Sequence, residues 1–361
     1  MENKKPDVIV NISEKSAYEY PIFIGENILE KAQEYIKKYT KATRYLVVTN
    51  KTVIKLYPNL LRLDNAEFLV LEDGEQYKNF ETYKLIMDKA LQMKLERKDA
   101  FVAFGGGVVG DITGFCAATY LRGIDFIQIP TTLLAQVDSS VGGKVAINTE
   151  YGKNLVGAFY QPKLVLADIA VLKTLDKRQF KTGLAEIVKY AFIEKTAGCD
   201  YKFFEFLYKN AAEIRSFDVN VMREMICICC EIKAMVVSKD EKELGLRAIL
   251  NFGHTYAHAI EKVTNYQHFT HGEAVAMGIK FAFDLAKHKK MVNDDYYNSA
   301  ISLLAKYGLT YVLPSVATKE SLVEAMTFDK KVLENKLRFI LPVEMGKVII
   351  SSDVEGLSSL V

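Results

Sequence analysis

The fold is decided by residues 101–120, which read Phe-Val-Ala-Phe-Gly-Gly-Gly-Val-Val-Gly-Asp-Ile-Thr-Gly-Phe-Cys-Ala-Ala-Thr-Tyr. The run Phe101–Phe104 predicts a short buried strand. Glycines at Gly105, Gly107 and Gly110 then mark a tight turn, and a helical pattern follows. A strand, a turn and a helix in this order are typical of proteins with a parallel α/β sheet.

Strand-like and helix-like segments alternate on both sides of this unit. The expected strands are Asp7–Ile12, Tyr20–Ile24, Tyr45–Thr49, Glu67–Leu71, Asp125–Ile129 and Leu164–Asp168, and the expected helices before the unit are Asn27–Tyr39 and Asn79–Met93. Strands separated by helices indicate a mostly parallel sheet. Such sheets bind their ligands at the carboxyl ends of the strands.

The pattern changes near residue 172. Helical periodicity then dominates, in segments Arg178–Lys195, Tyr201–Lys209, Asn220–Lys239, Gly253–Thr264, Gly272–Lys289 and Asp294–Tyr307, and strand character returns only at Leu337–Leu341 and Lys347–Ser351. We therefore expect a Rossmann-like, mostly parallel α/β domain at residues 1–172 and an all-helical domain at residues 173–361. The active site is expected in the cleft between them, because domain junctions are preferred ligand sites.

The totals are those of an ordinary globular protein. A length of 361 residues suggests two domains, and a net charge of +2 gives no footprint for nucleic acid. No apolar run reaches 18 residues and the first residues are no signal peptide, so we expect a cytoplasmic protein without a membrane partner. Cys227, Cys229 and Cys230 lack the paired spacing of zinc ribbons and are expected to be buried helix thiols.

The glycine turn fits a dinucleotide site. Glycine lets the backbone approach a pyrophosphate, and the start of a helix favours negative charge. Asp125 lies about twenty residues further on, where a ribose-binding acid is found in such sites. A tight turn without a ligand would explain the glycines equally well, and several strands precede this turn, which is unusual for a Rossmann fingerprint.

Cationic side chains recur in glycine-rich or helix-start segments, mixed with short polar residues. They are Arg122, Lys144, Lys153, Lys189, Lys233 and Arg247, accompanied by Asp138, Asn154 and Asn251. Cations with amide donors suit a substrate that carries phosphate or carboxylate. Each one alone is explained as a solvated surface charge, but as a group they favour an anionic substrate.

The chain has only five histidines, and three of them are candidate metal ligands. His254 and His258 are four residues apart and hence on one helix face, while His271 opens the next helix. Glu186 offers a carboxylate, with Lys189 three residues further on. Two histidines and a carboxylate with open positions make up a catalytic metal site. Ordinary helix histidines explain the spacing as well.

Seven segments together resemble the 3-dehydroquinate synthase family, and they follow its order from about residue 70 to 280. They are Asp73-Gly-Glu-Gln-Tyr-Lys78, Gly105-Gly-Gly-Val-Val-Gly-Asp111, residues 130–144, Lys153-Asn-Leu-Val-Gly-Ala-Phe159, Leu184-Ala-Glu-Ile-Val-Lys-Tyr190, Leu250-Asn-Phe-Gly-His-Thr255 and His271-Gly-Glu-Ala-Val275. The wider family includes other sugar-phosphate cyclases and, more distantly, glycerol dehydrogenases. The resemblance implies a homodimer that converts 3-deoxy-D-arabino-heptulosonate 7-phosphate to 3-dehydroquinate and phosphate.

The resemblance also implies three sets of site residues. One zinc or cobalt ion would be held by Glu186, His254 and His271. NAD would be bound by Asp73, Gly74, Glu75, Gln76, Tyr77, Lys78, Gly107, Val108, Val109, Gly110, Asp111, Thr131, Thr132, Lys144, Lys153 and Thr174. The substrate would meet the catalytic set Arg122, Asp138, Lys144, Asn154, Lys189, Lys233, Arg247, Asn251 and His258, with a C-terminal lysine at Lys330 or Lys331.

One departure and three rival functions stay open at this point. Asn50 stands where an aspartate is expected near the adenosine ribose, so the adenosine contacts are open. The rivals are an NAD- and metal-dependent polyol dehydrogenase, another sugar-phosphate cyclase and a non-catalytic nucleotide-binding module. The density of cations favours an anionic sugar phosphate over glycerol, and a convergence of Glu186, His254 and His271 would argue against the module.

Overall fold

The structure is a computed structural model, and it describes residues 5–13, 16–330 and 337–352. Contacts divide the chain into two compact units. Unit 1 comprises residues 1–175 and 222–238, and unit 2 comprises residues 176–221 and 239–361. The long helix α8 (Val219–Lys239) therefore belongs almost wholly to unit 1. The expected domain boundary near residue 172 stays a prediction.

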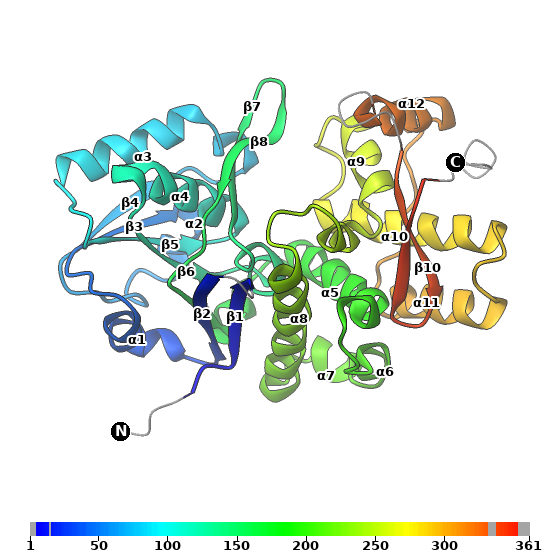
Figure 1. The fold of residues 1–361 in the computed structure, drawn as a ribbon, viewed down its shortest axis with the longest axis horizontal. Coiled ribbons are helices and arrows are strands. Elements are labelled where there is room, and N and C mark those ends of the chain that lie inside the picture. The colour runs from blue at the N-terminus through cyan, green and yellow to red at the C-terminus, as the bar shows by residue number, and fades with distance from the viewer. Residues whose placement is uncertain (1–4, 14–15, 331–336, 353–361) are drawn as a thin grey trace. The chain divides into compact units, whose positions relative to one another are not determined.

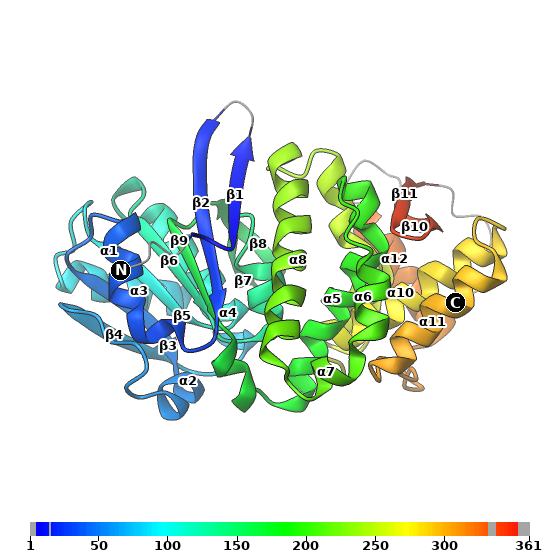
Figure 2. The same ribbon diagram turned by 90° about the horizontal axis from the view of Figure 1, so that it is seen from below.

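Unit 1 is built on a seven-stranded sheet with the order β1-β2-β9-β6-β5-β3-β4 (Figure 1). Its strands are β1 (Val8–Ser13), β2 (Ser16–Gly25), β3 (Tyr45–Asn50), β4 (Ala66–Leu71), β5 (Ala100–Gly105), β6 (Asp125–Pro130) and β9 (Leu164–Asp168). The pair β1–β2 is antiparallel, and every other pair is parallel. This confirms the mostly parallel sheet. Figure 2 shows β1 and the outer part of β2 projecting from it as a hairpin.

Helices cover both faces of this sheet. On β3, Tyr45 and Val47 face the core that includes α1 (Ala32–Tyr39) and α2 (Lys51–Leu56). Leu46 and Val48 face the opposite core, with α3 (Phe80–Gln92) and α4 (Gly107–Thr119). A strand buried on both faces reads as a continuous apolar run, which is why these strands were predictable.

The glycine turn follows the carboxyl end of β5 and leads directly into α4. One of its glycines is required by close approach alone, because a Cβ on Gly105 would lie 2.6 Å from Cβ of Val109. A Cβ on Gly110 would lie 2.8 Å from Oε1 of Gln128, the end of a side chain that can move. Helix–strand packing thus explains part of the glycine pattern without a ligand. Gly107 stays available for close approach by a ligand, since only the side chain of Ser139 lies near it.

The expectation for Asp125 is wrong. Asp125 begins β6 and pairs with Ala100 at the amino end of β5, whereas Gly105 pairs with Pro130 at the other end. The residues between the glycine turn and Asp125 form α4 and the turn after it. At Asp125 the chain is therefore at the amino end of the next strand. Asp125 lies near Lys163 there, with Oδ1 and Nζ 3.9 Å apart, and cannot reach a ribose at the carboxyl edge.

The segment after Gly142 and Gly143 forms a hairpin that the sequence pattern did not predict. Strands β7 (Lys144–Thr149) and β8 (Gly152–Phe159) pair antiparallel and stand out in Figure 1. Most of β8 is exposed or half-buried, so no apolar run announces it. The segment that carries Lys144, Lys153 and Asn154 is therefore a pair of strands.

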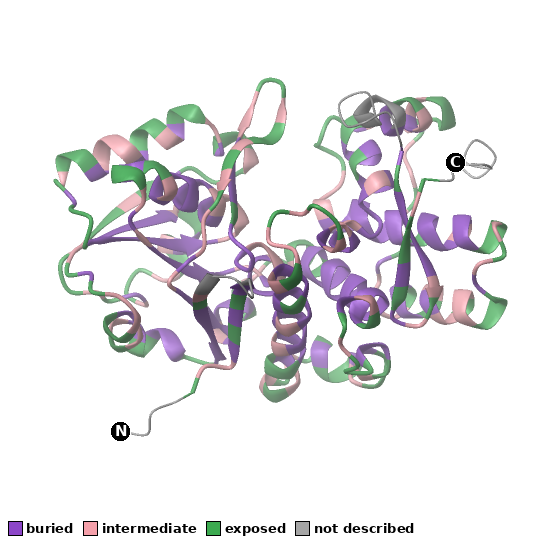
Figure 3. Cartoon of the chain, in the orientation of Figure 1, coloured by how far each residue is buried: buried purple, intermediate pink, exposed green. Residues whose placement is uncertain are grey.

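Unit 2 is mostly helical, as expected for the C-terminal part. Its elements are α5 (Lys177–Ala197), α6 (Phe203–Lys209), α7 (Ala211–Arg215), the 3₁₀ turn η6 (Leu246–Asn251), α9 (His254–Val263), α10 (His271–His288), α11 (Asp294–Lys306), α12 (Lys319–Lys330) and the ribbon β10 (Phe339–Glu344) with β11 (Lys347–Ser351). Helix α10 packs against α5, α9, α11 and β10, and Figure 3 shows it largely buried. No helix within the described ranges has the length and apolarity needed to cross a membrane.

Candidate functional site

Unit 2 brings the three predicted metal ligands together. Glu186 lies on α5, His254 begins α9 and His271 begins α10. One ligand atom from each lies within 4.8 Å of the others, and this is the one such group among the described residues. Oε1 of Glu186 lies 3.5 Å from Nε2 of His254 and 3.2 Å from Nε2 of His271. The structure thus supports the convergence that spacing alone left open.

The donor set fits a borderline divalent metal. Glu186 is fully buried, and a buried carboxylate is costly unless cations or hydrogen bonds surround it. Two imidazoles and one carboxylate match the ligands that zinc and cobalt accept, with positions left for a substrate. Glu186, His254 and His271 would therefore hold such an ion.

The two histidines differ in their protonation. Burial lowers the pKa of His254 to about 3, with Lys189 acting in the same direction and Glu186 against it. Burial also disfavours the charged form of His271, but hydrogen bonds to Glu186 and Glu261 outweigh it and raise the pKa of His271 to about 10. One imidazole is thus neutral and ready to ligate, and the other is held by carboxylates on both ring nitrogens.

Two further candidates flank this cluster. Lys189 is only 1% exposed and its Nζ forms an ion pair with Oε2 of Glu186, as their i,i+3 spacing predicted. His258 is exposed, with its ring centroid 5.6 Å from that of His254. A cation and an imidazole therefore stand beside the metal ligands.

The start of α4 in unit 1 is the candidate anion site that the sequence predicted. The N-cap residue Gly106 has no side chain, so no N-cap side chain accepts from the first N–H groups of α4. Such N–H groups can bind an anion. Within the predicted segment, Val109 faces the core, while Gly107, Val108 and Asp111 are partly exposed. Gly107, Val108 and Asp111 are thus the members that a nucleotide could touch directly.

Lys78 connects three segments of the predicted set. Its Nζ lies 2.5 Å from Oδ2 of Asp111 on α4 and 2.6 Å from Oδ1 of Asn154 on β8. The Lys78 side chain is only 4% exposed. Burial raises the pKa of Asp111, and the charge of Lys78 opposes that shift. A candidate NAD residue and a candidate phosphate residue thus share one buried cation.

Asn148 is a residue that sequence reasoning missed. Its amide Nδ2 donates to Oε1 of Glu75 over 2.7 Å, and its Oδ1 accepts from the backbone N–H of Asn154 over 2.9 Å. Asn154 has a φ of 57°, a left-handed conformation that needs such support. Nothing in the local pattern marks Asn148, because its partners come from a distant segment and from a hairpin that was not predicted.

Asn50 and Asp73 meet at the carboxyl ends of β3 and β4. Nδ2 of Asn50 donates to Oδ1 of Asp73, and the backbone N–H of Thr52 lies 3.2 Å from Oδ2 of Asp73. A carboxylate is therefore present where the sequence has asparagine instead of aspartate. It comes from Asp73, which the resemblance already included.

A π-helical turn carries another candidate pair. Asp138 lies in η4 (Ala135–Ser139), a π-helical turn. Such turns are rare in proteins, and those that occur are often found at functional sites. Nζ of Lys233 on α8 lies 2.6 Å from both Oδ1 and the carbonyl oxygen of Asp138. Lys233 is distant in sequence, yet it belongs to the same unit as Asp138.

Other predicted residues are placed apart from these groups. Arg122 is exposed on the turn η3 (Tyr120–Arg122) after α4, near the amino ends of the strands. Lys144 pairs with Phe159 at one end of the hairpin, whereas Asn154 lies near the other end.

The remaining candidates lie on exposed, turn or partly described segments. Lys153 is exposed, Thr131 is buried beyond β6, Thr132 accepts from the N–H of Ala135, and Oγ1 of Thr174 contacts the hydroxyl of Tyr57. Lys331 and the side chain of Lys330 lie outside the described residues.

Arg247 and Asn251 lie together in η6. Arg247 is 1% exposed, its backbone N–H donates to Asp240, and its guanidinium donates to the carbonyl oxygen of Glu241. Nδ2 of Asn251 donates to Oε1 of Glu243 over 2.7 Å. Glu243, which the sequence reasoning did not single out, is thus part of this group.

The cysteine cluster on α8 takes no part in the candidate site. Cys229 and Cys230 are buried, and the thiol of Cys230 donates to the carbonyl oxygen of Gln136. Burial raises the pKa of Cys227 to about 12. Cys229 and Cys230 are buried helix thiols, as expected, whereas Cys227 is only half-buried.

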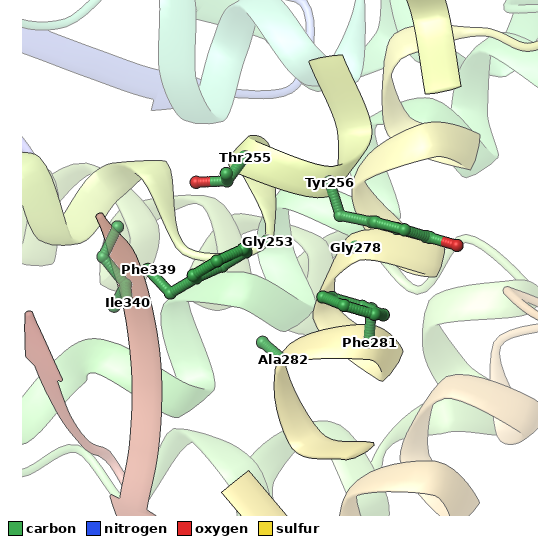
Figure 4. Close-up of a pocket in the computed structure, with 8 residues that line it drawn as sticks. All are labelled: Gly253, Thr255, Tyr256, Gly278, Phe281, Ala282, Phe339 and Ile340. Atoms are coloured by element: carbon green, nitrogen blue, oxygen red, sulfur yellow. The ribbon is translucent and has the colours of Figure 1, made fainter. Parts of the chain in front are cut away.

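A small crevice in unit 2 is also separate from the site. Figure 4 shows the aromatic rings of Tyr256, Phe281 and Phe339 around it; the complete lining is Gly253, Thr255, Tyr256, Gly278, Phe281, Ala282, Phe339 and Ile340. Tyr256 stacks on Phe281 with ring centroids 4.1 Å apart. Its lining holds no candidate residue, so we assign it to packing.

Family models match most of the chain. The 3-dehydroquinate synthase N-terminal model matches residues 68–182, and the C-terminal model matches residues 183–332. The 3-dehydroquinate synthases of Shewanella pealeana and Thermoanaerobacter pseudethanolicus are each 44% identical to this chain over 352 residues, with 96% of both chains covered.

Solved structures with the same fold contain nucleotide and metal. The 2-epi-5-epi-valiolone synthase of Streptomyces hygroscopicus, with NAD⁺ and Zn²⁺ bound, has a TM-score of 0.85 and 25% identity, covering 96% of each chain. A 2-deoxy-scyllo-inosose synthase with carbaglucose-6-phosphate, NAD⁺ and Co²⁺ has a TM-score of 0.81 and 28% identity, covering 95% of this chain and 94% of that one. A probable glycerol dehydrogenase from Sinorhizobium meliloti is 16% identical with a TM-score of 0.57, a likeness of fold alone.

The fold and the ligand cluster define a two-part protein of the dehydroquinate-synthase-like class. Both family models and nearly full-length relatives at 44% identity support a narrower assignment. The chain belongs to the 3-dehydroquinate synthase family.

Proposed function

We propose that the protein is an NAD- and metal-dependent lyase that converts 3-deoxy-D-arabino-heptulosonate 7-phosphate to 3-dehydroquinate and inorganic phosphate. Membership of the family over 96% of the chain carries this proposal. The reaction oxidises C5, eliminates phosphate across C6 and C7, reduces C5 again, opens the ring and closes the carbocycle by an aldol step. When bound, NAD would supply the transient hydride acceptor, and the return of the hydride to C5 would regenerate it in each turnover. The conversion would be a step of aromatic amino acid biosynthesis by the shikimate pathway.

Glu186, His254 and His271 would hold a zinc or cobalt ion. The bound ion would supply a Lewis acid that lowers the pKa of the hydroxyl at C5. His258, one turn beyond His254, is the candidate to relay the hydroxyl proton to solvent, since it is exposed. Lys189, whose Nζ forms an ion pair with Glu186, would stabilise the developing oxyanion.

The anionic groups of the substrate would be held by the remaining candidates. Lys144 and Asn154 would bind the phosphate, with Lys233 supplying further charge. Arg122 lies near the amino ends of the strands and is not assigned to this group. Arg247 and Asn251 would bind the carboxylate, for which a planar guanidinium is well suited. Asp138 would position Lys233, because its Oδ1 accepts a hydrogen bond from Nζ of Lys233. The phosphate of the substrate would itself remove the proton at C6, so a dedicated protein base need not exist.

The decisive experiment is an assay with the heptulosonate phosphate and catalytic NAD. We expect inorganic phosphate to be released in amounts far above the NAD added, without NADH at steady state, and a chelator to stop the reaction. Accumulating NADH with glycerol or another polyol would favour the dehydrogenase. Equal turnover of a heptulose phosphate that lacks the carboxylate would favour another cyclase. Nucleotide binding with no turnover of any of these would leave only a binding module.

A cytoplasmic homodimer is part of the same proposal. It is supported by the resemblance to the family. Light scattering of the purified protein at micromolar concentration should give twice the chain mass of 40.7 kDa. A value that stays at one chain mass would contradict the dimer.

A further inference from the structure

The two histidines of the cluster present the same ring nitrogen to Glu186. Each points Nε2 at Oε1 of Glu186, which leaves Nδ1 for an outer partner. Nδ1 of His254 lies 3.2 Å from the carbonyl oxygen of Phe252. Nδ1 of His271 lies 3.3 Å from Oε1 of Glu261. The outer partner is thus a neutral carbonyl in one case and a carboxylate in the other.

Glu261 is placed to reach His271 by the geometry of α9. His254, His258 and Glu261 follow the i, i+4, i+7 pattern, so they share one face of this helix. From that face Glu261 contacts the first residue of α10. Glu261 is 6% exposed, so water competes little for its oxygens. A buried glutamate on the helix face that carries a ligand is a signal that sequence reasoning could have used.

An ionised carboxylate and a carbonyl oxygen both accept hydrogen bonds and donate none. Each therefore requires a hydrogen on the histidine Nδ1 that it contacts. When the imidazole is neutral, as it must be to bind a metal, its lone pair then lies on Nε2, the nitrogen that faces Glu186. Outer partners of this kind fix the tautomer and the ring orientation of metal-binding histidines, and a carboxylate also raises the basicity of the ligand.

We propose that Glu261 is a positioning residue for the metal site, which accepts a hydrogen bond from Nδ1 of His271 and holds Nε2 toward the ion. This inference rests on the proposed function, because it assumes the metal site described there. Glu261 does not touch the ion or the substrate. It acts through His271, and its effect should appear first in metal affinity.

Two substitutions separate the hydrogen bond from the charge. Glu261→Gln retains an oxygen that can accept from Nδ1 but removes the charge, whereas Glu261→Ala removes both. We expect Glu261→Ala to weaken the affinity of the metal-depleted protein for Zn²⁺ by about 10- to 100-fold, with Glu261→Gln in between. Affinity is measured by competition with a chromogenic chelator, without substrate or NAD.

Glu194→Gln is the matched control. Glu194 is also a buried carboxylate, it lies on the same helix α5 as Glu186, and it accepts from the backbone N–H groups of Tyr201 and Phe203. Its loss should change stability but leave Zn²⁺ affinity within about twofold of the wild type. Circular dichroism on all variants identifies any that fail to fold, and the isosteric Glu261→Gln keeps the test valid if Glu261→Ala does.

The outcomes distinguish this inference from the proposed function. Wild-type Zn²⁺ affinity in folded Glu261→Ala and Glu261→Gln would overturn the role of Glu261 and leave the metal site intact. Equal losses in Glu261→Gln and Glu194→Gln would also overturn it, because the effect would then be general. A wild-type protein that binds no Zn²⁺ would overturn the metal site itself.

Discussion

At the scale of single residues, Lys78 is a buried cation that two oxygens make tolerable. Its Nζ contacts Asp111 and Asn154, and its backbone carbonyl accepts from the N–H of Asn148 over 2.7 Å. Removing one partner of a buried pair is costly because the other charge stays buried without compensation. Lys78 therefore stabilises the local structure in addition to any contact that it makes with a nucleotide.

We predict that Lys78→Met lowers the free energy of unfolding by about 3 kcal/mol. The cause is the carboxylate of Asp111, which would be left without its cation. Adding Asp111→Asn should restore about half of that loss, because the amide carries no charge. Urea denaturation of the single and double variants measures both values. Additive losses in the double variant would contradict this coupling.

We predict that His271→Ala abolishes phosphate release, because only two ligands would then hold the metal. Metal content per chain and turnover should fall together by at least about 100-fold. His288→Ala, which changes an exposed histidine on the same helix, is the control and should behave as the wild type. Full turnover in metal-depleted His271→Ala would refute the ligand assignment.

At the scale of elements, the start of α10 is fixed by a capping box. The Thr270 hydroxyl accepts from the N–H of Glu273, and the Glu273 carboxylate accepts from the N–H of Thr270. Arg178 of α5 donates to both oxygens of Glu273, 2.8 and 2.7 Å away. His271 is the first residue of this helix, so the cap also fixes the direction from which a metal ligand enters the cluster.

We predict a pH-dependent cost for Glu273→Gln. Burial alone would raise the pKa of Glu273, but the hydrogen bond from Arg178 outweighs it and holds the pKa below its usual range. The stabilisation is therefore present above the unfolded pKa of about 4.3 and is lost as pH falls through the lower folded pKa. The variant should be about 1 kcal/mol less stable at pH 7, and equal to the wild type once Glu273 is protonated.

Unfolding at a series of pH values measures this difference. Lys280→Ala is the control on the same helix, because its ion pair with Asp284 is exposed and should contribute less than about 0.5 kcal/mol. A difference for Glu273→Gln that persists at a pH well below the folded pKa of Glu273 would show that charge is not the cause.

Elements differed in how well their sequences announced them. The buried strands β3, β5 and β6 and the amphipathic helices α3 and α9 have periodic or continuous apolar patterns, and these depend only on local sequence. The hairpin β7–β8 has no such pattern because it is largely exposed. Asp125 was misplaced because an interval in sequence does not say at which end of a strand it stops.

The candidate site follows the same division. The convergence of Glu186, His254 and His271 was predictable from the resemblance, whereas helix spacing alone left it open because the three lie on different helices. Asn148 and Glu243 were not, because their roles arise from contacts between segments that fold together only in three dimensions. Local pattern therefore predicts ligands better than it predicts the residues that hold them.

At the scale of the whole molecule, the metal ligands all belong to unit 2 and the glycine turn belongs to unit 1. Ligands that bind only the folded state stabilise the part that contains their site, by about 4 kcal/mol at a thousandfold excess over Kd. Metal should therefore stabilise the helical unit selectively, and NAD the α/β unit.

We predict that chelation speeds amide hydrogen exchange in α5, α9 and α10 while β3, β5 and β6 keep their protection. The reason is that the ion joins those three helices through Glu186, His254 and His271. Hydrogen exchange with mass spectrometry, with and without chelator, measures this directly. Equal loss of protection in both sets would contradict a site confined to unit 2.

The assignment of α8 to unit 1 has a consequence for synthesis on the ribosome. Residues 1–175 emerge first, but the helix that completes their unit ends near residue 239, after the first part of unit 2 has already been made. The nascent α/β unit must therefore wait, without the contacts that Arg223, Cys230 and Lys233 make with it, for more than sixty residues. Translation is slow compared with folding, at about 5–20 residues per second, so this interval lasts seconds. The order in which the chain is made thus leaves unit 1 exposed for longer than its position at the N-terminus would imply.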